Sequence, residues 1–144
     1  MIVNGTLTSN GAGGSGTGAG GSVWIEASLL DGIGTISANG GQATDSYAGT
    51  GGGGRVAIYA SSSSFAGRIQ AAGGYQPSVS DIAQVGCAGT VYTVINSTTT
   101  LRVDNNGYTS GWKTSLVRNA LTSITLDYLA VENMAEFNLD ASTR

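Results

Sequence analysis

The chain has no histidine, one cysteine and one proline. Without histidine it cannot form a Ser-His-Asp triad, a Cys-His pair or a metal site built on imidazole. Cys87 has no second cysteine with which to form an internal disulfide. A single proline in 144 residues excludes a collagen-like chain and a proline-rich linker. These absences remove several common catalytic and structural designs.

Charge is also scarce. Charged residues make up 10% of the chain, and 9 acidic against 6 basic residues give a net charge of -3. This balance argues against the basic surface that binds nucleic acid. No run approaches the ~20 apolar residues of a membrane-spanning helix. We therefore expect neither a nucleic-acid partner nor membrane insertion. With 40% hydrophobic residues, the chain is apolar enough to fold, and its length suits one domain over residues 1–144.

Glycine, in contrast, occupies 24 positions and accompanies an internal repeat. Residues 20–28 align with residues 53–61 at an offset of 33 (53 minus 20), and residues 34–41 align with residues 67–74 at the same offset. Apolar residues alternate in both pieces, which is typical of half-buried strands. Each unit of about 32 residues is therefore predicted to hold two short strands.

Two short strands cannot bury their apolar face alone, so successive units must stack on one another. Parallel stacking in register predicts internal columns of side chains. One column is expected to hold Leu7, Ile36, Ile69, Leu101 and Phe137, a second Ser9, Ala38, Ala71, Val103 and Leu139, a third Val23, Val56 and Val91, and a fourth Ile25, Ile58 and Thr93.

The segments of variable length fall at one phase of the repeat, at residues 11–21, 40–54, 73–89 and 106–112. They are expected to project as glycine-rich loops from one corner. Asn-Gly pairs occur close to this phase, and glycine adopts positive φ freely while asparagine tolerates it. We interpret these pairs as one recurring tight corner: Asn10-Gly11, Asn39-Gly40 and Asn106-Gly107.

The segments Gly-Gly-Ser-Val-Trp-Ile-Glu-Ala (residues 20–27), Gly-Thr-Ile-Ser-Ala-Asn-Gly-Gly (34–41) and Gly-Gly-Arg-Val-Ala-Ile-Tyr (53–59) resemble glycine-rich parallel β-helix repeats of large bacterial extracellular or surface proteins. The resemblance covers most of residues 5–107 and fades after Trp112. It implies an all-β, right-handed parallel β-helix, a single-stranded solenoid of roughly four to five coils of about 32 residues. It also implies an extracellular or cell-surface location and a parent protein with more repeats. Residues 113–144 would form a less regular final coil.

Parallel β-helices often carry polysaccharide lyases and hydrolases, which need a base beside clustered acids or two facing carboxylates. In the repeat register Arg68 and Arg102 fall on adjacent coils with no aspartate beside them on that face. The acids fall at different phases of the repeat: Asp31, Asp45, Asp81 and Asp104. We therefore expect no catalytic residue, no metal site and no cofactor.

The candidate binding residues are exposed aromatics, which suit stacking against sugar rings but equally suit packing of loops onto a sheet. Those expected on the outward side of the strands are Trp24, Tyr59 and Tyr92, and those in loops are Tyr47, Tyr75, Tyr108 and Trp112.

These features together predict a non-catalytic structural or adhesive segment of an extracellular protein. Open strand edges at the two ends of a solenoid would bind copies of the chain or neighbouring repeats, and could build fibres. The alternative is a β-helix that binds or degrades a polysaccharide. Loss of glycan binding on removal of an outward aromatic residue would favour that alternative.

Overall fold

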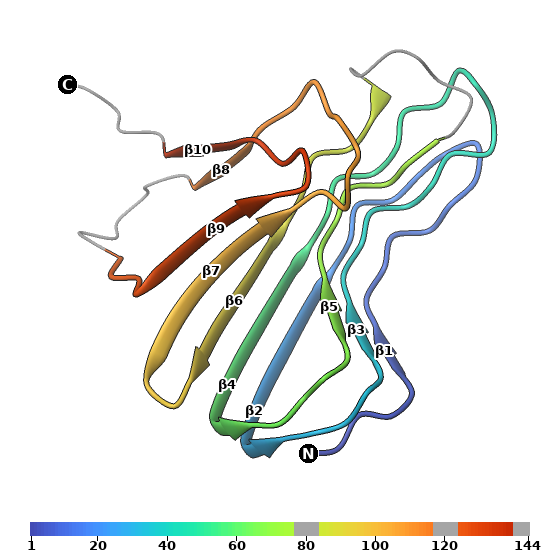
Figure 1. Cartoon of the computed structure of the whole chain (residues 1–144). Coiled ribbons are helices and arrows are strands. Elements are labelled where there is room, and N and C mark those ends of the chain that lie inside the picture. Colours follow the sequence, from blue (N-terminus) through green and yellow to red (C-terminus); the bar gives the residue numbers. More distant parts are fainter. Residues whose placement is uncertain (77–83, 117–123, 140–144) are drawn as a thin grey trace.

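The computed structural model describes residues 1–76, 84–116 and 124–139, which contain strands and no α-helix (Figure 1). The strands of these ranges form three separate sheets, ordered β1-β3-β5, β2-β4-β6-β7-β9 and β10-β8. Their bounds are β1 Thr6–Thr8, β2 Ser22–Leu30, β3 Thr35–Ser37, β4 Arg55–Ser63, β5 Arg68–Gln70, β6 Thr90–Ile95, β7 Thr98–Asp104, β8 Thr114–Leu116, β9 Tyr128–Glu132 and β10 Phe137–Leu139.

The first part of the chain stacks in parallel register, as the repeat predicts. In the first sheet Leu7 lies opposite Ile36, and Ile36 lies opposite Ile69. In the second sheet the pairing also follows the offset of 33 residues, since Val23 lies opposite Val56. The same ladder continues from Val56 to β6. Parallel stacking of β1-β3-β5 and of β2-β4-β6 is therefore confirmed.

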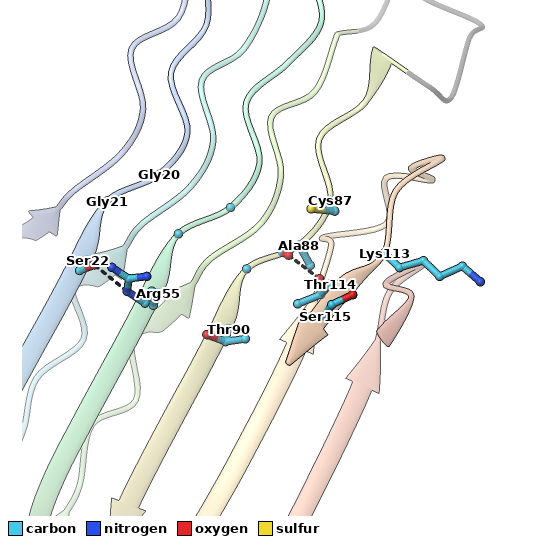
Figure 2. Close-up of a pocket in the computed structure, with 13 residues that line it drawn as sticks. Gly20, Gly21, Ser22, Arg55, Cys87, Ala88, Thr90, Lys113, Thr114 and Ser115 are labelled. Carbon is cyan, nitrogen blue, oxygen red and sulfur yellow. Dashed lines mark hydrogen bonds between the residues drawn. The ribbon is translucent and has the colours of Figure 1, made fainter. Parts of the chain in front are cut away.

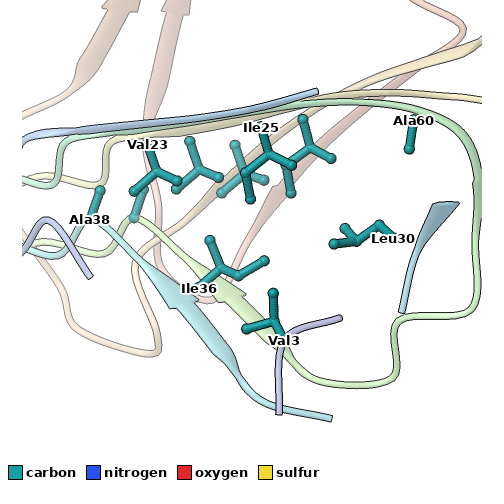
Figure 3. Packing of buried hydrophobic residues seen from close by; sticks show 11 residues of the cluster. Val3, Val23, Ile25, Leu30, Ile36, Ala38 and Ala60 are labelled. Carbon is teal, nitrogen blue, oxygen red and sulfur yellow. The ribbon is translucent and has the colours of Figure 1, made fainter. Parts of the chain in front are cut away.

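The two stacks face each other across a hydrophobic core (Figure 3). Alternation along β2 and β4 sends every second side chain inward, so that Ile25 and Ile58 are almost fully buried. Figure 3 shows Ile25 across the core from Ile36 of β3. The buried members of the core are Val3, Val23, Ile25, Leu30, Ile36, Ala38, Val56, Ile58, Ala60, Ala71 and Val91.

The parallel stacking of β2, β4 and β6 ends after β6, where the direction of the chain reverses. Ile95 and Thr98 are paired, and the two residues between them, Asn96 and Ser97, have φ of 50° and 63°. Positive φ at both central residues is the conformation of a two-residue type I′ hairpin, whose twist suits antiparallel strands. β7 therefore runs antiparallel to β6 and continues the five-stranded sheet, while β9 pairs with β7 in parallel.

The expected right-handed parallel β-helix of four to five coils is therefore wrong. The described strands form three unclosed sheets with mixed parallel and antiparallel pairing. Leu101 does not extend the column of Leu7, because the hairpin places it opposite Tyr92. Phe137 is not in that column either, since it pairs with Thr114 in the sheet of β8 and β10.

Side chains of β7 and of the residues that follow it bond to β5 and to the residues after β5. The guanidinium of Arg102 donates to the carbonyl of Ile69, and Nη2 of Arg68 donates to Oδ1 of Asn106 at 2.6 Å. Asn105 is 1% exposed, and its Oδ1 accepts the backbone N–H of Gly73 at 2.9 Å. The far edge of the first stack is thus occupied by β7 and the residues that follow it.

Of the three Asn-Gly pairs expected at one corner, Asn106-Gly107 has the expected positive φ, 55° and 82°, but the other two pairs do not. The side chains of Asn10 and Asn39 bond instead to the next unit of the stack. Oδ1 of Asn10 accepts the N–H of Asn39, and Oδ1 of Asn39 accepts the N–H of Ala72. Asn105, not Asn106, makes the third bond of this kind. Of the described glycines only Gly14, Gly32 and Gly107 have positive φ. Most loop glycines are therefore not there for positive φ.

Candidate functional site

The outer face of the five-stranded sheet carries the first group of expected binding residues. On β2, β4 and β6 the inward positions hold valine and isoleucine, so the alternate positions face away from the core. Parallel register places Trp24 opposite Ala57 and Ala57 opposite Tyr92. Tyr59 lies two residues further along β4, on the same face. Three neighbouring strands therefore each contribute one aromatic ring.

These three rings form a contiguous group that we call the aromatic strip: Trp24, Tyr59 and Tyr92. The ring centroids of Trp24 and Tyr59 lie 4.7 Å apart, and those of Tyr59 and Tyr92 lie 6.0 Å apart. Both pairs are tilted, with interplanar angles of 35° and 57°. Trp24 is 64% exposed, and its Nε1 donates to Oε1 of Glu26 at 3.1 Å. Tyr59 and Tyr92 are half-buried. The strip is therefore an oriented aromatic surface, with Trp24 as its exposed member, on a sheet whose register is fixed by its core.

The other candidate aromatics do not share one place. Tyr75 and Tyr108 stack on each other with centroids 4.2 Å apart and an interplanar angle of 5°, and both are half-buried. Tyr47 is 93% exposed in the loop between β3 and β4. Trp112 is 62% exposed just before β8. The structure thus brings together one group from the strands and one pair from the loops.

A pocket of about 440 Å³ adjoins the strip where β2, β4 and β6 begin. Figure 2 shows Ser22, Arg55 and Thr90 at the starts of these three strands. They form one row of the ladder, and the next outward row is that of Trp24 and Tyr92. The full lining is Gly20, Gly21, Ser22, Gly53, Gly54, Arg55, Cys87, Ala88, Gly89, Thr90, Lys113, Thr114 and Ser115.

The lining of this pocket includes two cationic side chains and no carboxylate. Nε of Arg55 donates to Oγ of Ser22 at 2.9 Å. Lys113 lies on the other side of the pocket, extends away from Arg55, and pairs with Glu136 at 3.2 Å. Burial raises the pKa of the Cys87 thiol above its ordinary value, so this thiol is protonated at neutral pH.

The sequence did not predict a site at Ser22, Arg55 or Thr90. The available signal was the repeat itself, which places all three at the same phase, immediately after a glycine pair or a glycine. They went unnoticed because their side chains differ in kind. What they have in common is a position at the mouth of the pocket, and that position depends on β8, which no repeat predicted.

The arginines considered for catalysis have structural contacts. Arg102 bonds to the carbonyl of Ile69 and pairs with Asp104 at 3.5 Å, so the expectation that no aspartate lies beside it is wrong. Arg68 bonds to Asn106. The two arginines are therefore not free on neighbouring coils, because β7 is reversed relative to the repeat.

Several carboxylates also serve the backbone around them. Oδ1 of Asp31 accepts the N–H of Gly32 and the hydroxyl of Ser64. Oδ1 of Asp45 accepts the N–H of Tyr47. Oδ1 of Asp104 accepts bonds from two asparagines, Asn106 through its N–H and Asn133 through its side chain. Asp81 lies outside the described residues. These contacts are typical of acids that stabilise turns.

Comparison of the chain with protein-family models, with characterised proteins and with solved structures finds no match. Within the described ranges, no helix is long and apolar enough to cross a membrane. The same ranges contain no group of three or more histidine, cysteine, aspartate or glutamate side chains placed to hold a metal ion. The function must therefore be argued from the outer face itself.

Proposed function

We propose that this chain is a non-catalytic adhesive module that holds a polysaccharide on its aromatic strip. The observation that carries the proposal is the alignment of three aromatic rings on three neighbouring strands of one sheet. Tyrosine and tryptophan combine a flat apolar face with a polar group, which suits the C–H face and hydroxyls of a pyranose ring. A rigid sheet also holds the rings in place, so little conformational entropy is lost on binding.

A non-catalytic role agrees with the contacts of the ionisable groups. Arg68 and Arg102 bond to neighbouring segments, and Asp31, Asp45 and Asp104 bond to local backbone or side chains. An acid-base pair needs groups that are free to meet a substrate. The aromatic strip, in contrast, lies on the outer face of the sheet, with Trp24 exposed and Tyr59 and Tyr92 half-buried.

Single substitutions in the strip test the proposal. Binding to a panel of neutral and acidic polysaccharides would be measured by affinity electrophoresis and by calorimetry. We expect Trp24→Ala and Tyr92→Ala each to weaken binding by about 5–30-fold, since aromatic anchors are worth roughly 1–2 kcal/mol or more. Tyr47→Ala is the matched control, because Tyr47 is exposed and lies in a loop outside the strip. Equal affinities for the wild type and both strip variants, or no binding across the panel, would refute the proposal.

A second candidate, a structural role through self-association, is favoured by the free strand edges. β1 and β2 are the edge strands of their sheets and lie on the same side of the stack (Figure 1). Large apolar side chains are exposed beside this edge: Met1, Ile2, Leu29 and Ile33. Unpaired strand edges are templates for pairing with another chain.

Among the described strands, β9 is the other edge of the five-stranded sheet, and Tyr128, Leu129 and Val131 on it are exposed. Pairing through the edge of β1 and β2 alone would give dimers, and pairing that also uses β9 would give fibres. We therefore expect self-association in sedimentation velocity experiments. Lysine on an edge strand discourages such pairing. The variant Thr6→Lys/Thr8→Lys should remain monomeric, and a wild-type chain that is monomeric at high concentration would contradict this candidate.

A further inference from the structure

The aromatic strip and the pocket are parts of one continuous surface. The row of Ser22, Arg55 and Thr90 lies two residues before the row of Trp24 and Tyr92 on the same strands, and both rows face outward. Two residues of a strand span about 6.6 Å, which is close to the width of one sugar ring. A chain of sugars lying on the strip would therefore reach the pocket with a neighbouring ring.

The charge of the pocket opposes that of the whole chain. The chain carries a net charge of -3, yet the pocket is lined by Arg55 and Lys113 and by no acid. Within the described ranges Arg55 forms no ion pair, and its Nε bond to Ser22 leaves the two terminal amino groups of the guanidinium available. Such a group favours a carboxylate or a sulfate ester, which it binds through paired hydrogen bonds.

The other polar groups of the lining suit the same ligand. Hydroxyls of Ser22, Thr90 and Ser115 can donate to an anion or to sugar hydroxyls. Lys113 is paired with Glu136, but both side chains are more than half exposed, and such pairs are worth little. Lys113 can therefore turn to an anion in the pocket at small cost. A volume of about 440 Å³ holds a complete sugar ring rather than a bare ion.

We propose that this surface recognises an anionic polysaccharide, with a pyranose ring on the strip and the acidic group of a neighbouring ring at Arg55. The inference rests on the proposed function and adds the chemical class of the ligand to it. The acidic group is a uronate carboxylate or a sulfate ester, which present the same charge to the guanidinium. The strip supplies affinity for the sugar chain, and the pocket supplies the preference for charge.

Matched polymers with and without charge test this preference. Oligomers of galacturonate, mannuronate and glucuronate would be compared with their carboxyl-reduced forms, and sulfated oligosaccharides with their desulfated forms. We expect at least one anionic oligomer to bind tenfold or more tightly than its uncharged form, with an affinity that falls as salt rises. Whichever acidic group shows the preference identifies the source of the charge.

Two arginine variants locate the effect. Arg55→Gln should abolish the difference between charged and uncharged oligomers, while Arg68→Gln removes the same charge outside the pocket and should leave the difference intact. Trp24→Ala should weaken the binding of both forms. Because Cys87 lines the pocket, the bound anionic oligomer should also slow alkylation of its thiol at least threefold.

Different results would refute polysaccharide binding and the preference for anionic polysaccharides. Equal binding of charged and uncharged oligomers, or equal losses in Arg55→Gln and Arg68→Gln, would overturn the anionic preference and leave polysaccharide binding in place. Binding of neither form would overturn both proposals. Thermal unfolding of each variant confirms that a loss of binding is not a loss of fold.

Discussion

An added methyl group at Gly40 is expected to destabilise the protein strongly, because two walls of one loop touch at this point. A Cβ built on Gly40 would lie 1.9 Å from the carbonyl oxygen of Gly51. The same contact recurs in the neighbouring loops, between Gly11 and Gly18 at 1.9 Å and between Gly73 and Gly86 at 2.0 Å. We call these six residues the glycine neck: Gly11, Gly18, Gly40, Gly51, Gly73 and Gly86.

The cost follows from the distance that the walls must move. An ordinary non-bonded contact is about 3.5 Å, so Gly40→Ala would require a displacement of about 1.6 Å. One backbone bond joins the walls, from the N–H of Gly51 to the carbonyl of Gly41 at 3.0 Å, and a second joins the N–H of Gly40 to the carbonyl of Ala72 in the neighbouring unit at 2.9 Å. Loss of two such bonds, at about 1 kcal/mol each, adds to an overpacking cost of about 1–3 kcal/mol. We expect a loss of about 4 kcal/mol in the free energy of unfolding.

Urea unfolding followed by fluorescence measures this loss. With an m-value of about 2 kcal/mol/M, the midpoint of Gly40→Ala should fall by about 2 M. Gly5→Ala is the matched control, because a Cβ on Gly5 meets nothing within 4 Å and its φ is not positive. That control should be neutral or stabilise the protein by up to about 1 kcal/mol. Equal midpoints for the two variants would refute the explanation of the glycine neck by close backbone approach.

Three further predictions concern single side chains. Asn105→Ala should lower the free energy of unfolding by about 3 kcal/mol, because the buried N–H of Gly73 loses its acceptor. The control Asn10→Ala removes the corresponding exposed bond and should cost less than half of that in the same urea titration. Ser97→Gly should raise the thermal midpoint of unfolding by about 2–4 °C, because the φ of 63° at Ser97 strains a residue that has a Cβ. A lower midpoint would contradict the hairpin geometry. Cys87 should react with iodoacetamide at pH 8 several-fold more slowly in the native chain than in the urea-unfolded chain, because its raised pKa lowers the thiolate fraction. Equal rates of alkylation, followed by mass spectrometry, would contradict the burial of this thiol.

Local periodicity predicted the parallel stacks but could not predict where they end. The columns of Leu7 and Val23 followed from an alternation that is repeated without a gap, because inward side chains in parallel register must coincide. Leu101 fits the same alternation equally well, since a strand has the same period of two in parallel and antiparallel pairing. Only the turn decides between them, and Asn96-Ser97 is a weaker hairpin signal than Asn-Gly.

The candidate site, like the fold, was predicted only in part from the sequence. Trp24, Tyr59 and Tyr92 were predicted to face outward, and the register brings them into contact. The pocket could not be predicted, because β8 lies beyond the repeat and the hydroxyl of Thr114 reaches the carbonyl of Ala88 across 26 residues of sequence. Glycine was predicted at the corner for positive φ, which is correct at Gly107, whereas Gly11 and Gly40 are required because a Cβ there would meet a backbone oxygen. Sequence patterns report neighbours along a strand more reliably than contacts between loop walls.

The aromatic strip is the feature that the stacking itself does not require. Register is set by the inward valines and isoleucines and by the backbone bonds at the glycine neck, none of which depends on the outward positions. Ala57 shows that an outward position between Trp24 and Tyr92 accepts a methyl group. Contact among the three rings stabilises the sheet but does not explain why they lie beside a cationic pocket in an acidic chain. The proposed ligand, which is both ring-shaped and negatively charged, would account for the rings and the charge together.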